Sequence, residues 1–194
     1  MGIREDILHY MPFNEQEFRD RAVMLGFMEN NPDAFLRTSL VAHMTASAWV
    51  VNRERDKALM VFHSIFGSWS WAGGHADGDE DLLAVAMREV KEETGVRHLR
   101  PITEDIFSLE VLTVDGHEKR GEYVPSHLHM NVTYLLESRE TDALRIREDE
   151  NSGVRWFTLN GALAASTEPW FVDRIYGKLN EKLLRLNENE AAAK

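Results

Sequence analysis

Residues 88–95 read REVKEETG and place Glu89, Glu92 and Glu93 within five positions. On a helix, positions i, i+3 and i+4 lie on one face, so these three carboxylates would crowd together. Like charges at this spacing destabilise an isolated helix by roughly 0.2–0.5 kcal/mol per pair. A hard divalent cation, which binds through oxygens, would relieve the repulsion. Taken alone, the stretch is more typical of a solvated acidic helix face.

The sequence around this stretch predicts an amphipathic helix. The segment DEDLLAVAMREVKEETG, residues 79–95, directs Leu82, Ala86 and Val90 toward a core. Asp79 is the expected N-cap, and Gly95 stands where a glycine commonly ends a helix. Upstream, Gly73 and Gly74 allow a close approach of the backbone to a ligand.

The spacing of glycines and charged residues from Gly74 to Val96 favours the metal site over the solvated helix face. The pattern is Gly74, five residues, Glu80, seven residues, Arg88-Glu89-Val90, one residue, Glu92-Glu93, one residue, Gly95-Val96. From average composition, such a string arises by chance in about one chain in ten million or fewer. This string matches the Nudix box at every fixed position, and the chain therefore resembles a Nudix hydrolase.

The resemblance implies an α/β (α+β) fold, the Nudix-like α/β/α sandwich with a mixed β-sheet. The alternation of strands and helices from about residue 41 to 165 agrees with it. We expect a helical extension over residues 1–38, a Nudix core over 39–165, and a C-terminal helix packed on the core over 166–194. The extension is predicted to contain a helix over residues 14–30, with Phe18, Val23, Met24 and Phe27 as one buried stripe.

The resemblance also implies roles for the residues of the box. Glu89, Glu92 and Glu93, with the carbonyl of Gly73, would bind Mg²⁺ or Mn²⁺. Arg88 would orient a glutamate, and Gly74, Glu80 and Gly95 would support the loop-helix geometry. The catalytic base is predicted within the box at Glu92, or in the later acidic loop Glu148-Asp149-Glu150, where we select Glu150. An acidic surface turn remains the alternative for that loop.

Strand alternation in HLHMNVTYLL places His127, His129, Asn131 and Thr133 on one face. We expect His129 and Asn131, together with His43 on an earlier strand, to contact the substrate; a solvated polar face is the alternative. Trp69 and Trp71 would either stack on a base or pack against other side chains.

Bulk composition limits the partners. The 194-residue chain has 22 basic and 33 acidic side chains, a net charge of −11, and no cysteine. The charge argues against nucleic acid as a partner. No apolar run reaches the roughly 20 residues that span a bilayer, so we expect no membrane partner and a cytoplasmic location. The expected partner is a small-molecule diphosphate, and a homodimer is left open.

The leading hypothesis is a metal-dependent hydrolase that cleaves a diphosphate linkage in a nucleoside diphosphate linked to a moiety X, or in a similar organic pyrophosphate. Isopentenyl-diphosphate isomerases resemble this family, but they use a cysteine, which this chain lacks. A non-catalytic, nucleotide-binding regulator is the alternative, although such proteins usually carry damaged boxes. The proline of ADP-ribose pyrophosphatases is missing, since residues 110–113 read EVLT. The sequence therefore leaves the substrate open.

Overall fold

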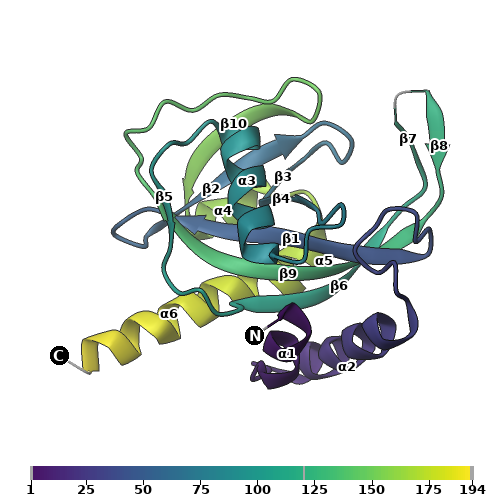
Figure 1. Ribbon diagram of the computed structural model, residues 1–194. Helices are drawn as coiled ribbons and strands as arrows, with labels where there is room; N and C mark the ends of the chain where they lie inside the picture. The colour runs from purple at the N-terminus through teal and green to yellow at the C-terminus, as the bar shows by residue number, and fades with distance from the viewer. Residues whose placement is uncertain (1, 120, 193–194) are drawn as a thin grey trace. The chain divides into compact units, whose positions relative to one another are not determined.

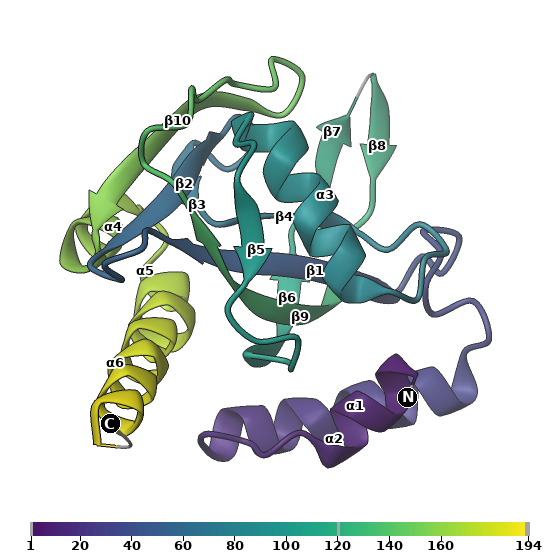
Figure 2. The same ribbon diagram turned by 60° about the vertical axis from the view of Figure 1, so that its left-hand side comes forward.

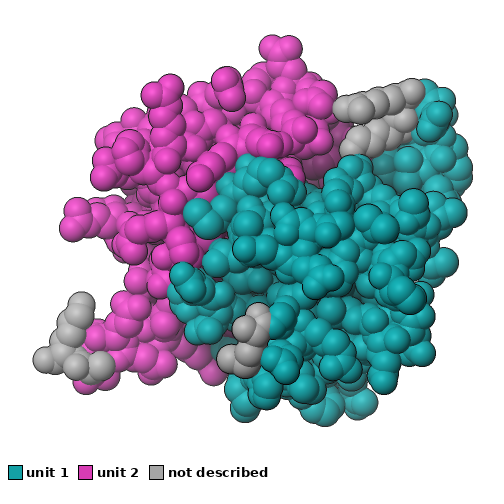
Figure 3. Space-filling view, in the orientation of Figure 1, with its two compact units in different colours: residues 1–47, 73–88, 103–134 teal, residues 48–72, 89–102, 135–194 magenta. Residues whose placement is uncertain are grey.

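The computed structural model describes residues 2–119 and 121–192. The chain divides into two compact units, which Figure 3 colours separately. The first unit comprises residues 1–47, 73–88 and 103–134, and the second comprises residues 48–72, 89–102 and 135–194.

Eight strands form the larger sheet, and their order is β10-β2-β1-β9-β5, with β3 on β2, β4 on β1 and β6 on β9 (Figure 1). Their bounds are β1 Ala42–Val51, β2 Lys57–His63, β3 Ser68–Ser70, β4 Ala72–His75, β5 Leu99–Pro101, β6 Ser108–Val114, β9 His127–Ser138 and β10 Asn151–Thr158. A separate hairpin pairs β7 (His117–Lys119) with β8 (Glu122–Val124). The alternation of strands and helices expected from about residue 41 to 165 is confirmed.

The helices are α1 Ile3–His9, α2 Glu15–Asn30, α3 Leu82–Thr94, α4 Leu159–Ala165, α5 Pro169–Phe171, the π-helical segment η1 Val172–Tyr176, and α6 Gly177–Ala192 (Figure 2). Helices and sheet together confirm the predicted α/β (α+β) class. None of the helices within the described residues is long and apolar enough to cross a membrane.

In the first unit, α2 begins where the sequence predicted, because Asn14 accepts the Glu17 N–H at 3.0 Å as an N-cap. The predicted buried stripe is wrong in part. Phe18 and Val23 are about half exposed, whereas Met24 is fully buried. The unexpected buried residue is Glu17, which faces β6 with no exposed surface. Hydrophobic spacing could not predict that this helix packs through a carboxylate.

Glu17 belongs to a buried polar network within the first unit. Its carboxylate accepts hydrogen bonds from the Tyr10 hydroxyl at 2.7 Å, the Phe13 N–H at 2.7 Å and the Ser108 hydroxyl at 2.8 Å. Ser108 is also hydrogen-bonded to Glu110. Because buried polar groups are costly without partners, this network fixes how α2 lies against β6.

In the second unit, β2 pairs antiparallel with both β3 and β10, and Val61 lies opposite Ser70 and Val154. Trp69 of β3 and the nearby Trp71 both pack against aromatic side chains. Trp69 makes edge-to-face contacts with Phe62 and Phe157, and Trp71 packs edge-on against Tyr176. These contacts favour packing over stacking on a base for both tryptophans.

Helix α3 starts later than predicted. Asp81, not Asp79, is the N-cap, because its carboxylate accepts the Ala84 N–H at 3.0 Å. Asp79 instead accepts the Asp81 N–H, so these two aspartates, separated by Glu80, form the turn before the helix. Leu82, Ala86 and Val90 are buried as predicted.

Gly95 ends α3 as the sequence predicted. It adopts a φ of +76°, and its N–H donates to the carbonyl of Lys91 at 3.0 Å. A Cβ at this position would lie 2.9 Å from the Cβ of Arg145. Glycine is therefore required here by both conformation and space.

Candidate functional site

Three carboxylates converge in the second unit. Glu89 and Glu93 lie one turn apart on α3, and Glu150 lies in the turn before β10. Each offers an oxygen, and these oxygens lie within 4.8 Å of one another. Glu93 is buried, while Glu89 and Glu150 are partly buried. The structure thus brings together two predicted metal ligands and the residue that we selected as a loop base.

Backbone contacts position the loop that carries Glu150. Its N–H donates to the Arg147 carbonyl at 2.9 Å, and its carbonyl accepts from Ser64 at 3.0 Å. The side chain of Asn151 donates to the backbone carbonyl of Glu93 at 3.0 Å. Asn151 is buried, so this bond fastens the loop to the last turn of α3. Sequence reasoning missed Asn151, which has no marker beyond its place beside the acidic triplet.

Arg147 lies among these carboxylates, and sequence reasoning missed it as well. Its Nη1 donates to Glu92 at 2.9 Å and lies 3.4 Å from Glu150 and 3.7 Å from Glu89. Its Nε lies 3.4 Å from Asp149. Burial opposes its charge, but the surrounding carboxylates outweigh this and raise the pKa of Arg147 above its usual value. The charged run REDE, residues 147–150, was the available signal.

Glu92, the predicted base within the box, is exposed and paired with Arg147. The chemistry of the whole donor set fits a hard cation, because every convergent ligand atom is a carboxylate oxygen. The guanidinium of Arg147 already lies among four carboxylates, which shows that this group of side chains attracts cations. Mg²⁺ or Mn²⁺ therefore suits the residues present.

The remaining residues of the box lie in the first unit. A Cβ on Gly73 would come within 2.6 Å of the Ala46 carbonyl oxygen, so this glycine permits a close backbone approach. Gly74 follows in β4, and the exposed Glu80 accepts the Leu82 N–H through its carbonyl at 3.1 Å. Arg88 lies 3.6 Å from Asp79. Metal ligation by Gly73 and orientation of a glutamate by Arg88 stay predictions.

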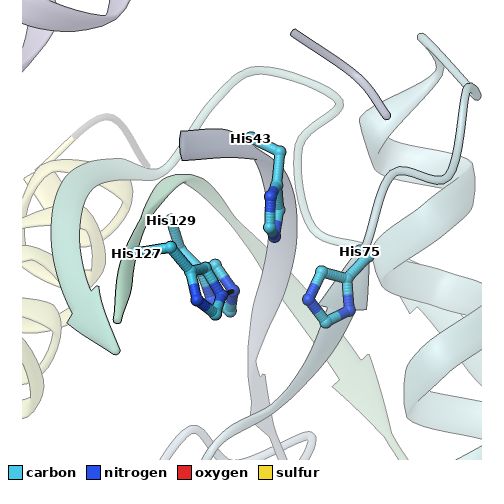
Figure 4. Close-up of side chains that lie close together, drawn as sticks. All are labelled: His43, His75, His127 and His129. Carbon is cyan, nitrogen blue, oxygen red and sulfur yellow. Dashed lines mark hydrogen bonds between the residues drawn. The ribbon is translucent and has the colours of Figure 1, made fainter. Parts of the chain in front are cut away.

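A second cluster lies in the first unit and contains two of the predicted substrate contacts. Figure 4 shows the rings of His43 (β1), His75 (β4), His127 and His129 (both β9) converging. One ring nitrogen of each lies within 4.8 Å of one from every other. Burial lowers the pKa of His43 and lowers that of His129 to about 2, so both imidazoles are neutral at pH 7. Sequence reasoning did not place His75 here.

Asn131, the third predicted substrate contact, is buried in the network that contains Glu110. Its amide oxygen accepts from Thr45 and Ser47, at 3.0 and 2.9 Å, and its amide nitrogen donates to Glu110 at 3.1 Å. Only 1% of this residue is exposed. These contacts favour a structural role for Asn131 over contact with a substrate.

A family model of the NUDIX domain matches residues 41–176 of this chain. The chain belongs to the Nudix hydrolase family. The resemblance drawn from the box is thereby confirmed.

Known proteins resemble this Nudix chain to different extents. It is 36% identical over 87 residues to the m7GpppN-mRNA hydrolase NUDT17 of Xenopus laevis, a match covering 45% of this chain and 27% of that protein. The match thus spans about a quarter of the length of this curated relative. A C. elegans Ap4A hydrolase in a binary complex aligns with a TM-score of 0.54 and 21% identity, covering 75% of this chain and 98% of that chain.

A NUDIX-family hydrolase from Clostridium perfringens aligns with a TM-score of 0.49 and 20% identity, covering 74% of this chain and 97% of that one. The alignment with the Ap4A hydrolase is evidence for the fold alone, and it agrees with the predicted Nudix-like sandwich.

Proposed function

We propose that this Nudix chain is a metal-dependent pyrophosphohydrolase, acting on a nucleoside diphosphate linked to another moiety or on a similar organic pyrophosphate. The observation that carries the proposal is the convergence of Glu89, Glu93 and Glu150 within 4.8 Å. Such a set of oxygens suits a hard divalent cation, and a diphosphate is the kind of anionic group that reacts at such sites.

Each residue has a role that follows from its place. Glu89 and Glu93 would hold Mg²⁺ or Mn²⁺, with Glu92 as a further predicted ligand. When bound, the cation would neutralise the diphosphate and polarise a phosphoryl oxygen. Arg147 neutralises part of the carboxylate charge and offers further N–H groups to an anionic substrate.

Glu150 is the better placed of the two predicted bases. It is partly buried beside Glu89 and Glu93, where a carboxylate could accept a proton from an attacking water. Glu92 is exposed, its carboxylate is hydrogen-bonded to Arg147 at 2.9 Å, and it lies outside the convergent group of carboxylates. We therefore assign proton acceptance to Glu150 and a cation-binding role to Glu92.

The name of the Xenopus relative supplies a second candidate substrate. An m7GpppN cap is a phosphoanhydride bridge between two nucleosides, and this chain is 36% identical to that relative over 87 residues. Hydrolysis of this phosphoanhydride bridge would use the same metal-dependent chemistry as hydrolysis of a small-molecule diphosphate. The net charge of −11 argues against affinity for the RNA that follows a cap, so a small-molecule diphosphate remains our first choice.

The test is a hydrolysis screen with Mg²⁺ or Mn²⁺, in which ³¹P NMR detects the products from nucleotide sugars, dinucleoside polyphosphates, organic diphosphates and a capped oligonucleotide. We expect turnover of at least one compound by the wild type, and its loss in Glu93→Gln. Glu148→Gln is the matched control, because Glu148 is exposed and lies outside the convergent group. Binding of nucleotides without turnover of any compound would favour the non-catalytic regulator instead.

A further inference from the structure

The four histidines of the first unit form a cluster of nitrogen ligands that the proposed hydrolysis does not use. His43 and His127 are buried, with 5% and 9% of their surfaces exposed, and His75 and His129 are partly buried. Among the described residues, the metal-ligating groups gathered in this cluster are imidazoles alone. Four histidines held together inside a chain with only 8 histidines need a physical explanation.

Hydrogen bonds fix which nitrogen of two rings is available. The Nδ1 of His43 lies 3.1 Å from the Ser39 carbonyl oxygen, and that of His127 lies 2.9 Å from the Pro125 carbonyl oxygen. A carbonyl only accepts, so each Nδ1 carries the proton and donates it. Each Nε2 then presents a lone pair. This is the arrangement in which a backbone carbonyl orients a metal-binding histidine.

One of these lone pairs has no partner within the described part of the chain. The Nε2 of His43 is buried and makes no hydrogen bond there. The Nε2 of His127 faces the Nε2 of His129 at 3.1 Å. A buried nitrogen lone pair without a donor is unfavourable, and a cation at the centre of the cluster would satisfy it.

The strands that carry the histidines are fastened to one another by backbone hydrogen bonds. The Ala76 N–H, next to His75, donates to the Met44 carbonyl at 3.1 Å. The Leu128 N–H, between His127 and His129, donates to the Val41 carbonyl at 2.9 Å. The ligands therefore project from strands rather than from free loops, which favours a preorganised site.

We propose that His43, His75, His127 and His129 form a binding site for one divalent transition-metal ion of the Zn²⁺ class. Nitrogen ligands favour Zn²⁺, Co²⁺, Ni²⁺ or Cu²⁺ over Mg²⁺, which prefers oxygen. The site is therefore chemically distinct from the glutamate cluster. It also gives His43 and His129 a role other than direct substrate contact.

The distances suit such an ion. Zn–N bonds of about 2.0–2.1 Å in a tetrahedron separate the nitrogens by about 3.3–3.4 Å. The His127 and His129 nitrogens are already 3.1 Å apart, and no pair exceeds 4.8 Å. Small rotations of the imidazoles would close the wider pairs. For His129 to bind through Nε2, its proton must reside on Nδ1, as it does in His43 and His127.

The experiment is a titration of the full-length protein with Co²⁺ in the presence of excess Mg²⁺, followed by displacement with Zn²⁺. Co²⁺ in a nitrogen tetrahedron gives an intense visible ligand-field band. We expect this band to develop to one ion per chain and to disappear when Zn²⁺ is added. His75→Ala and His127→Ala should each weaken binding by more than the roughly 10- to 100-fold that loss of an outer hydrogen bond costs.

Two controls make the result specific. His9→Ala removes an exposed histidine of α1 whose Nδ1 contacts the Glu5 carbonyl, and it should bind Co²⁺ as the wild type does. Circular dichroism in the presence of a chelator verifies that each variant is folded, and His75, which is only partly buried, is the milder of the two substitutions.

The proposal is overturned if the wild type binds no Co²⁺ under these conditions, or if His75→Ala and His127→Ala bind it as tightly as the wild type does. It is also overturned if Glu93→Gln, rather than the histidine variants, removes the ion. The hydrolysis screen is a separate measurement, so failure of either proposal leaves the other standing.

Discussion

Arg147 donates from Nη1 to the carboxylate of Glu92 at 2.9 Å, and the same nitrogen lies 3.4 Å from Glu150. Arg147 thus joins α3 to the acidic loop of residues 148–150, in addition to the hydrogen bond from Asn151 to the Glu93 carbonyl. The positive charge of the Arg147 guanidinium lies close to the carboxylates at which Mg²⁺ or Mn²⁺ is proposed to bind. This relationship links the stability of the site to its affinity for metal.

Arg147→Gln should therefore separate these two properties. In the absence of divalent metal, the variant should have a lower Tm than the wild type, because Glu89, Glu92 and Glu150 lose a shared positive neighbour. Its affinity for Mg²⁺ should rise, since a competing positive charge is gone. Thermal melts and calorimetric Mg²⁺ titrations measure both effects. Weaker Mg²⁺ binding in the variant would show that Arg147 supports the ion instead of competing with it.

Metal binding should stabilise the wild type. An ion that binds only the folded chain adds about 2.7 kcal/mol at a concentration of 100 times its Kd. We expect Mg²⁺ to raise the Tm of the wild type and to raise that of Glu93→Gln much less. Differential scanning fluorimetry with and without Mg²⁺ tests this, and Glu148→Gln should respond as the wild type does. Equal shifts in the wild type and Glu93→Gln would place the ion elsewhere.

Asp142 predicts a pH-dependent part of the stability. Hydrogen bonds from the His98 N–H, the His98 ring and the Arg97 N–H lower the pKa of this carboxyl to about 2. Its contribution is therefore present above the unfolded pKa of about 3.9 and is lost as the pH falls toward about 2. Asp142→Asn should be less stable than the wild type at neutral pH, and the difference should shrink at about pH 3. Urea unfolding at both pH values measures it, and a difference independent of pH would refute this linkage.

The buried network of the first unit predicts a large effect from Glu17→Ala. The substitution would remove the carboxylate partner of the Tyr10 hydroxyl and of the Phe13 N–H, while Tyr10 keeps a hydrogen bond to the Phe107 carbonyl at 3.3 Å. A buried group that loses its partner costs about 1–3 kcal/mol. We expect a loss of about 1–3 kcal/mol in the free energy of unfolding. Glu15→Ala is the control on the same helix, because Glu15 is exposed; an equal loss there would contradict the network's importance.

Local sequence patterns, such as residue spacing and helix-capping residues, predicted a large part of this fold. The box fixed the place of α3 and its terminal glycine, Gly95, because helix ends and close approaches demand particular residue types. The start of α3 was misplaced by two residues, because Asp79 and Asp81 both favour a cap and only the fold selects between them.

The candidate site was predicted less completely, because it depends on contacts between residues far apart in the sequence. The spacing of Glu89 and Glu93 is local and was visible, but the approach of Arg147 and Asn151 follows from how the loop folds back. Similarly, alternation on β9 placed His127 and His129 on one face, while their meeting with His43 and His75 required the pairing of separate strands. Glu17 on α2 was missed because hydrophobic periodicity does not identify a buried carboxylate.

The central claim, that the convergent glutamates catalyse hydrolysis of a diphosphate, is tested most directly by the kcat of wild type, Glu150→Gln and Glu148→Gln on the best substrate of the screen with Mg²⁺. We predict that Glu150→Gln lowers kcat by about 10²- to 10⁴-fold, the usual contribution of a general base, and that it binds Mg²⁺ and stays folded. Glu148→Gln should keep the wild-type kcat. An unchanged kcat in Glu150→Gln, or an equal loss in both variants, would contradict the account.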